Sequence, residues 1–235
     1  MQFDHKDNDF LIDYNELLSL AALELKGHMG ALANPTLNKQ ETVTLLYRDV
    51  VNYSDGHTKK IKKINMFMLR VKFLVRILLM FINLVITSTL FRVKSIPKNC
   101  IYINTWLEPR CVKGESLQDD FFRDLIFDLE GIGPTIVSFN VVDFSILKKV
   151  KKIDVPSNYI ISIGLLGLTD IIQLMKNYYV NAKIKLKNTY LFKGVDVVNV
   201  INHSLLIDYY EFRSFHAFLS LKIAEKIKHF KPSLY

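Results

Sequence analysis

Residues 100–140 read CIYINTWLEPRCVKGESLQDDFFRDLIFDLEGIGPTIVSFN, and this stretch decides the predicted fold. It begins and ends with short apolar runs, and a polar loop follows the first of them. Residues 116–130 have the apolar spacing of a helix, which the glycines and the proline at 131–134 end. The order strand, loop, helix, strand predicts a crossover connection. We therefore expect an α/β fold with parallel strands and a helix on one face of the sheet.

The carboxyl end of the first predicted strand carries Trp106, Glu108 and Arg110. Ligands of open parallel sheets bind at the carboxyl ends of the strands, so these three residues form the candidate site. A carboxylate there can act as a general base or hold a sugar hydroxyl, and a guanidinium suits a phosphate or a carboxylate. The structural alternative is that Trp106 belongs to the core and that Glu108 and Arg110 form a surface ion pair.

Asp119, Asp120 and Asp124 fall in the first turns of the helix predicted at 116–130, where negative charge favours the helix dipole. Considered alone, these acidic residues have a structural role. The sequence has no P-loop, no Gly-x-Gly-x-x-Gly, no paired cysteines at metal-ligand spacing and no nucleophile elbow. No metal site is predicted.

The chain has 235 residues, of which half are hydrophobic, and a formal net charge of +8. This length suits one sizeable domain with accessory elements, or two small domains. The positive charge suggests a nucleic acid, an acidic membrane surface or a phosphate-bearing ligand as partner. Nucleic acid is not expected, because no nucleic-acid-binding module is recognised. Residues 1–13 are acidic and polar, so they do not have the pattern of a secretory signal peptide. Two cysteines make no disulfide framework, and we therefore expect reduced thiols in the cytoplasm.

Residues 61–91 predict a basic amphipathic helix, on which Lys62, Lys72 and Arg76 lie along one stripe. The uncharged stretch between Arg76 and Arg92 has about fifteen residues, fewer than the roughly 20 of a spanning helix. A span is therefore the least favoured arrangement. The helix either lies in the membrane interface, with these cations toward anionic headgroups, or packs against the domain or a partner subunit. The sequence favours these two alternatives equally.

The remaining residues continue the helical and apolar patterns. We expect helices at 10–26, 39–51, 141–152 and 164–181, a buried strand at 159–163, a strand or helix start at 195–201, one long last helix from Leu205 to Ile227, and entry into a further strand at 231–235. That last feature suggests a truncated reading frame or the boundary of an expressed fragment. The expected organisation is a helical leader at 1–60, an amphipathic helix at 61–93 and a Rossmann-like domain at 94–235.

Residues 104–110, NTWLEPR, and 119–125, DDFFRDL, resemble a pattern in bacterial surface-carbohydrate biosynthesis proteins. These glycosyltransferase-like proteins are encoded with capsule and lipopolysaccharide genes. In that family a strand ends in Trp-x-Glu and a helix begins with Asp-Arg-Tyr-Phe-Gly-x-Leu, while a later Glu-Asn-x-Pro-Trp-Glu-type motif is absent here. The matching residues are Trp106, Glu108, Asp119, Phe122 and Leu125, whereas Asp120 and Arg123 replace the family's arginine and glycine.

The resemblance covers residues from about 40 to 235 and implies the first Rossmann-like half of a two-domain glycosyltransferase of the GT-B arrangement. It implies Glu108 as catalytic base or acceptor ligand, Arg110 as phosphate or carboxylate ligand, Trp106 as a stacking platform for a sugar, and Asp119 as a further substrate contact.

The same resemblance implies that this chain alone binds no cofactor, because the nucleotide-sugar donor of the complete enzyme would occupy the second half. The implied acceptor is a glycan or a lipid-linked glycan, and the implied location is the cytoplasmic face of the cell membrane. The alternative function is a non-catalytic scaffold, which the amphipathic helix recruits to a membrane or a partner.

Overall fold

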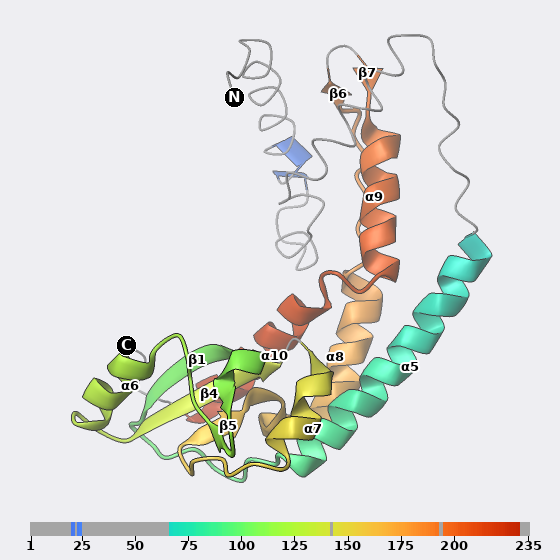
Figure 1. Ribbon diagram of the computed structural model, residues 1–235. Helices are drawn as coiled ribbons and strands as arrows, with labels where there is room; N and C mark the ends of the chain where they lie inside the picture. Colours follow the sequence, from blue (N-terminus) through green and yellow to red (C-terminus); the bar gives the residue numbers. More distant parts are fainter. Residues whose placement is uncertain (1–19, 22, 25–65, 142, 193–194, 231–235) are drawn as a thin grey trace, which may run out of the picture. The chain divides into compact units, whose positions relative to one another are not determined.

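The computed structural model describes residues 20–21, 23–24, 66–141, 143–192 and 195–230. The chain divides into two compact units, of which the first comprises residues 1–76 and 176–218 and the second residues 77–175 and 219–235. Residues 176–218 thus group with the amino-terminal part of the chain. The colours of Figure 1 follow the order of the chain.

The second unit is built around a three-stranded parallel sheet in the order β1-β4-β5 (Figure 1). Its strands are β1 (Ile101–Leu107), β4 (Thr135–Val141) and β5 (Tyr159–Ile161). β1 and β4 pair in register along their whole lengths. All seven residues of the central strand β4 are buried, as expected of a parallel strand covered on both faces. The predicted α/β class and parallel pairing are confirmed, with helices flanking the sheet.

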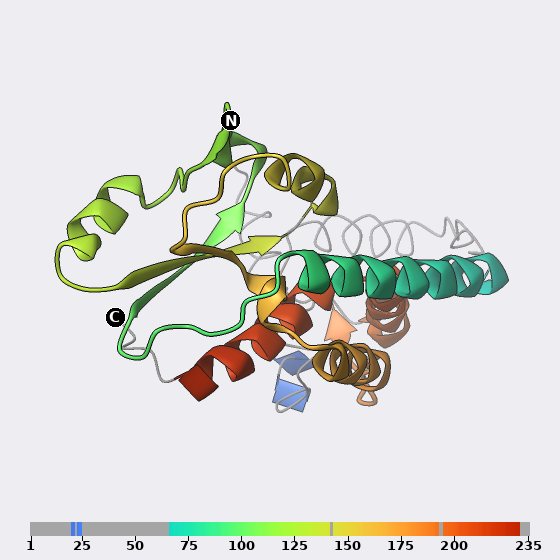
Figure 2. The same cartoon turned by 90° about the horizontal axis from the view of Figure 1, so that it is seen from below.

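Helices lie on both sides of this sheet (Figure 2). The helices of the second unit include α6 (Arg123–Glu130) and α7 (Leu147–Val150), and parts of α5 (Met66–Leu90), α8 (Leu168–Asn181) and α10 (Phe215–Phe230). Ile227 of α10 packs on one face of the sheet, against a cluster that includes Tyr102 and Ile136. The short 3₁₀ helices η2 (Phe144–Ile146) and η3 (Ser162–Leu165) precede α7 and α8.

The connection from β1 to β4 differs from the predicted helix at 116–130. After η1 (Pro109–Cys111), the strands β2 (Val112–Lys113) and β3 (Ser116–Leu117) form an antiparallel hairpin, and α6 begins only at Arg123. Gly114 adopts a positive φ of 61° in the two-residue turn, a conformation that glycine takes at little cost. The prediction was wrong over 116–122, since this turn redirects the chain before a helix can start.

The prediction of one long helix from Leu205 to Ile227 is also wrong. The chain forms α9 (Val198–Tyr210) and α10, separated by a break at Phe212, which has a positive φ of 61°. The amide of Phe212 donates to Tyr209 O over 3.2 Å, and that of Arg213 donates to Asp208 O over 3.1 Å. These two bonds form a Schellman motif, which ends a helix by satisfying its last carbonyls. Glycine usually occupies this left-handed position, so a phenylalanine there gives no sequence signal.

An aromatic cluster forms the core of the first unit. The buried ring of Tyr178 lies 4.7 Å from that of Phe212, measured between centroids, and 5.3 Å from that of Phe215. Phe73 of α5 lies 4.7 Å from Tyr209. A short antiparallel pair, β6 (Leu191–Phe192) and β7 (Val195–Asp196), precedes α9. The stretch at 195–201 is therefore a two-residue strand followed by a helix start, separate from the parallel sheet.

Of the predicted leader, the described residues are Leu20, Ala21, Leu23 and Glu24, all of them helical. The predicted helix at 39–51, Lys62 and the expected strand entry at 231–235 lie outside the described residues. Glu24 connects the leader to the segment before β6, because its carboxylate accepts hydrogen bonds from the amide of Lys187 over 2.6 Å and from the Tyr190 hydroxyl over 2.5 Å.

Candidate functional site

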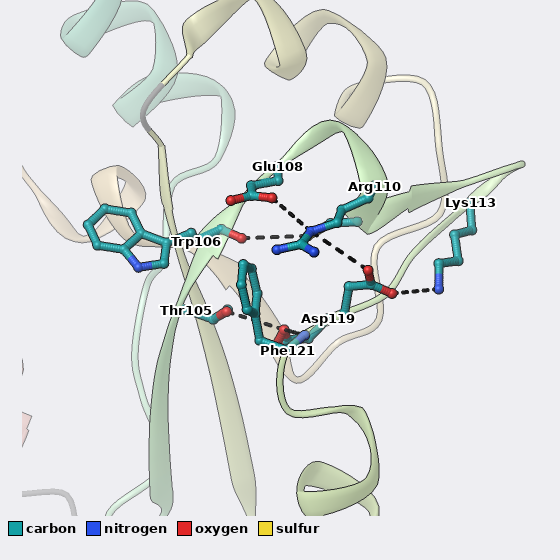
Figure 3. A network of polar contacts seen from close by, with 9 residues as sticks. Thr105, Trp106, Glu108, Arg110, Lys113, Asp119 and Phe121 are labelled. Atoms are coloured by element: carbon teal, nitrogen blue, oxygen red, sulfur yellow. Dashed lines mark hydrogen bonds and ion pairs between the residues drawn. The ribbon is translucent and has the colours of Figure 1, made fainter. Parts of the chain in front are cut away.

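The structure places Trp106, Glu108 and Arg110 at the carboxyl end of β1, as the sequence predicts for this strand. Trp106 is 46 % exposed, so it is not a core residue. Its indole points away from the group formed by Arg110, Phe121 and Asp119 (Figure 3). The strand end therefore brings the three predicted side chains to one edge of the sheet, but it does not bring the indole together with the two charged groups.

Glu108 and Arg110 form an ion pair, with 2.7 Å between Arg110 Nε and Glu108 Oε2. Arg110 Nε also lies 3.7 Å from Asp120 Oδ2, and Lys113 Nζ lies 2.8 Å from Asp120 Oδ1. The side chains of the Glu108–Arg110 pair are about half exposed, so the pair adds little stability, typically about 0–1 kcal/mol. A ligand can therefore replace either Glu108 or Arg110 as the partner of the other, because breaking this ion pair costs little free energy.

Arg110 also lies over the ring of Phe121, with 4.2 Å between its guanidinium carbon and the ring centroid (Figure 3). Cation–π contacts of this kind contribute about 0.5–1 kcal/mol at exposed sites. The guanidinium thus lies against the Phe121 ring, and its Nε faces the carboxylates of both Glu108 and Asp120. Arg110 is positioned for a fork contact with an anion, although its nearest present partners are the chain's own carboxylates.

Asp119 is buried, with 1 % of its surface exposed. Its Oδ1 accepts hydrogen bonds from Thr105 Oγ1 over 3.2 Å and from the amide of Phe121 over 2.9 Å. Successive residues of a strand point to opposite faces, so Asp119 joins Thr105 on the face opposite to Trp106. Asp119 fixes the loop before α6 to the end of β1 through Oδ1, whereas its other oxygen, Oδ2, is buried with no hydrogen-bond partner among the described residues. It precedes α6, and of the three acidic residues only Asp124 lies in the helix's first turn.

Two polar residues that the sequence interpretation missed lie at the ends of the neighbouring strands. Asn140 of β4 pairs in register with Trp106, so the two side chains share a face, and Asn140 Oδ1 is buried with no hydrogen-bond partner. Ser162, directly after β5, also has a buried hydroxyl without a partner. Buried polar atoms of this kind usually bind protein, water or a ligand. The signal in the sequence is a polar residue inside an apolar strand, TIVSFNV.

The predicted membrane-contact residues Lys72 and Arg76 lie on α5 and are exposed, whereas Lys62 lies outside the described residues. Residues 67–90 form a helix that is long and apolar enough to cross a membrane by length and composition. Its most apolar 18 residues have a mean hydropathy of 2.1, and 17 % of them are buried. Large apolar side chains exposed on this helix are Phe67, Met68, Val71, Leu74, Val75, Leu78, Leu79, Ile82, Ile86 and Leu90.

These ten apolar side chains lie on one side of α5. At about 100° per residue they fall within an arc of about 160°. Lys72 and Arg76 border one edge of this arc, and Arg70 borders the other. The buried residues Phe73 and Leu84 lie on the opposite side of the helix. We call the exposed arc the apolar face of α5.

Within the described part of the chain, no group of three or more His, Cys, Asp or Glu side chains is arranged to hold a metal ion. Cys100 and Cys111 are free thiols, and both are fully buried. Burial raises the pKa of the Cys100 thiol, and it raises the pKa of Tyr102 to about 12, so these groups stay protonated near neutral pH.

No protein-family model, no curated protein and no solved structure matches this chain. The resemblance to surface-carbohydrate biosynthesis proteins therefore rests on the sequence motifs at residues 104–110 and 119–125 alone.

Proposed function

We propose that this protein acts at the surface of a membrane that contains anionic lipid, with the apolar face of α5 as the element that enters the interface. The observation that carries the proposal is the combination on one helix of an exposed apolar face and cations at both of its edges. In an interfacial helix the apolar side chains enter the acyl region, while flanking lysines and arginines extend to the headgroups.

The positions of the charges favour an in-plane helix over a spanning one. Arg70, Lys72 and Arg76 all lie in the first half of α5. A charged side chain at the bilayer centre costs about 2.5–3.5 kcal/mol even on the insertion scale. The uncharged remainder of the helix, residues 77–90, is about 21 Å long at 1.5 Å per residue, shorter than the roughly 30 Å hydrocarbon core.

Sedimentation with vesicles tests the proposal. Leu74→Gln/Leu78→Gln replaces two exposed side chains of the apolar face, and we expect it to lower binding to vesicles with anionic lipid at least about tenfold. Phe127→Gln/Ile132→Gln is the matched control, because these two side chains are 79 % and 77 % exposed elsewhere in the chain. Equal loss in both variants, or no binding by the unmodified protein, would refute the proposal.

A fluorescence experiment distinguishes the in-plane from the spanning helix. Trp106 is the single tryptophan, so Trp106→Phe provides a silent background. In that background, tryptophan replaces Phe67, Leu78 or Ile86 in turn, and lipids brominated at different depths quench it. An in-plane helix gives one shallow depth for all three positions. A spanning helix gives a deep position for residue 78 and shallow positions for the other two.

A second candidate function concerns the sheet. We propose that the carboxyl edge binds the acceptor sugar of a glycosyltransferase reaction, as the first Rossmann-like half of a GT-B-type enzyme. The supporting observation is a half-exposed indole on the same sheet face as the unpartnered Oδ1 of Asn140. An indole can stack on a sugar ring while the amide oxygen accepts from a hydroxyl. Glu108 would be the base and Arg110 the phosphate ligand, once a ligand displaces their mutual ion pair.

Because Trp106 is the single tryptophan, its fluorescence reports directly on sugar binding at this edge. We expect a saturable change with at least one member of a panel of bacterial surface oligosaccharides, and a weaker response in Asn140→Ser. No response to any oligosaccharide would contradict acceptor binding. In the complete enzyme, sugar transfer retained by Glu108→Gln would remove Glu108 from the catalytic role.

A further inference from the structure

A pocket of about 350 Å³ is lined by residues of the first unit alone, none of which belongs to the candidate site at the end of β1. Three cations line it: Arg70 from α5, and Lys183 and Lys185 from the extended segment between α8 and β6. Neither the predicted site nor the apolar face of α5 uses the two lysines. The described residues that line the pocket include no Asp or Glu.

The three cations have no ion pair with a described residue, unlike the arginine and lysine at the end of β1. Like charges that converge on one pocket repel one another, and an anion bound between them removes this repulsion. An arginine fork beside two lysine ammonium groups suits phosphate oxygens, because the guanidinium binds two oxygens at once and the lysines supply point charges.

The segment that carries the two lysines is held in place by a side chain of α9. Asn202 accepts a hydrogen bond from the amide of Leu186 over 2.7 Å and donates one to Leu186 O over 3.0 Å. Ile184 and Leu186 are buried, whereas Lys183 and Lys185 are exposed, so the segment alternates between core and solvent. This arrangement fixes the backbone that carries both lysines before a ligand arrives, which lowers part of the entropy cost of binding.

The pocket also has an apolar part, formed by Ile184, Leu206 and Tyr210. His203 and Asn199 of α9 add polar groups at its wall. We propose that this pocket binds a phosphate monoester, with the cations on the phosphate and the apolar residues against the carbon skeleton next to it. Two sources have this chemistry: the headgroup of an anionic lipid and a soluble phosphorylated metabolite. The proposal does not depend on membrane binding by α5.

Calorimetric titration with two soluble probes tests the proposal. The probes are glycerol 3-phosphate and dihexanoyl phosphatidic acid below its micellar concentration, which share the phosphate monoester and differ in the acyl chains. We expect saturable binding of the unmodified protein to one or both. Tighter binding of the lipid, by about tenfold or more, identifies a lipid headgroup as the source, since apolar contacts add affinity. Equal binding identifies a soluble phosphate ester.

The variant Lys183→Gln/Lys185→Gln removes two of the three cations, and we expect at least about a tenfold loss of affinity for either probe. Lys148→Gln/Lys149→Gln is the control, because it removes the same charge from two exposed residues of α7 outside the pocket. Arg70→Gln on α5 gives a second, independent variant, and circular dichroism checks that each protein folds. Failure of the unmodified protein to bind either probe, or equal losses in the control, would overturn the proposal.

Discussion

The carbonyl oxygen of Phe91 lies 1.9 Å from the point where a β-carbon on Gly164 would stand. The chain that leaves α5 therefore approaches η3 more closely than any side-chain-bearing residue permits. The amide of Val93 donates to Gly164 O over 3.0 Å at the same place, so the contact is a backbone-to-backbone crossing. Only a glycine at position 164 fits this crossing.

The first prediction follows from this close approach. Gly164→Ala must displace the backbone at residue 91, and we expect it to lower the free energy of unfolding by about 1–3 kcal/mol, as overpacking does. Urea denaturation measures the change. Gly133→Ala is the control, since no atom lies within 4 Å of the added β-carbon there. Equal stability of the Gly164→Ala protein and the unmodified protein would contradict the crossing.

The second prediction concerns the left-handed residue between α9 and α10. Phe212→Ala removes a ring that contacts Phe73, Tyr178 and Phe215, and we expect a loss of about 3–5 kcal/mol. Phe212→Gly loses the same contacts but adopts the positive φ without strain, so it should be about 1 kcal/mol more stable than Phe212→Ala. Thermal unfolding of the two variants side by side checks this order. The reverse order would show that the Schellman motif does not form.

The third prediction is a pH dependence of the contact between the leader and the segment before β6. Burial alone would raise the pKa of Glu24, but hydrogen bonds from the Tyr190 hydroxyl and the amides of Lys187 and Asn188 outweigh it and lower the pKa below 4.5. A lowered carboxylate pKa stabilises the folded state above the unfolded value of 4.5, and this contribution is lost as the pH falls through the folded pKa.

Comparison of the unmodified protein with Glu24→Gln checks the pH dependence. We expect the difference in melting temperature to be largest near neutral pH, where Glu24 is ionised, and to shrink as the pH falls below 4.5. Asp154→Asn, at an exposed acidic position in another part of the chain, removes a charge of the same sign and serves as the control. A difference that grows toward acid pH would show that the carboxylate does not hold this contact.

The apolar runs in the sequence and the turn-forming residues between them were enough to predict the three parallel strands. The apolar runs at the start of β1, along β4 and in β5 are each bounded by Gly, Pro or polar residues, and a crossover of that length requires parallel pairing. The hairpin β2–β3 was not predictable in the same way, because two-residue strands are too short to show a period. The break between α9 and α10 was not predictable either, because a phenylalanine such as Phe212 rarely adopts a positive φ.

The candidate site was predictable only as a position along the chain. The strand end identified Trp106, Glu108 and Arg110, but the orientation of each side chain depends on where β1 ends and where η1 begins. The partners of Arg110 come from the loop before α6, whose course the sequence did not reveal. Asn140 was overlooked because a single polar residue in an apolar strand becomes informative only when its neighbours are known.

The packing of Ile227 against the cluster that includes Tyr102 and Ile136 has a consequence for synthesis on the ribosome. Ile227 is made about 90 residues after the end of β4, which takes roughly 5–20 s at common elongation rates. Throughout that interval one side of the nascent sheet has no cover from α10 and offers apolar surface to other chains. Newly made protein should therefore depend on chaperones until α10 emerges, and slower translation should lengthen this exposure.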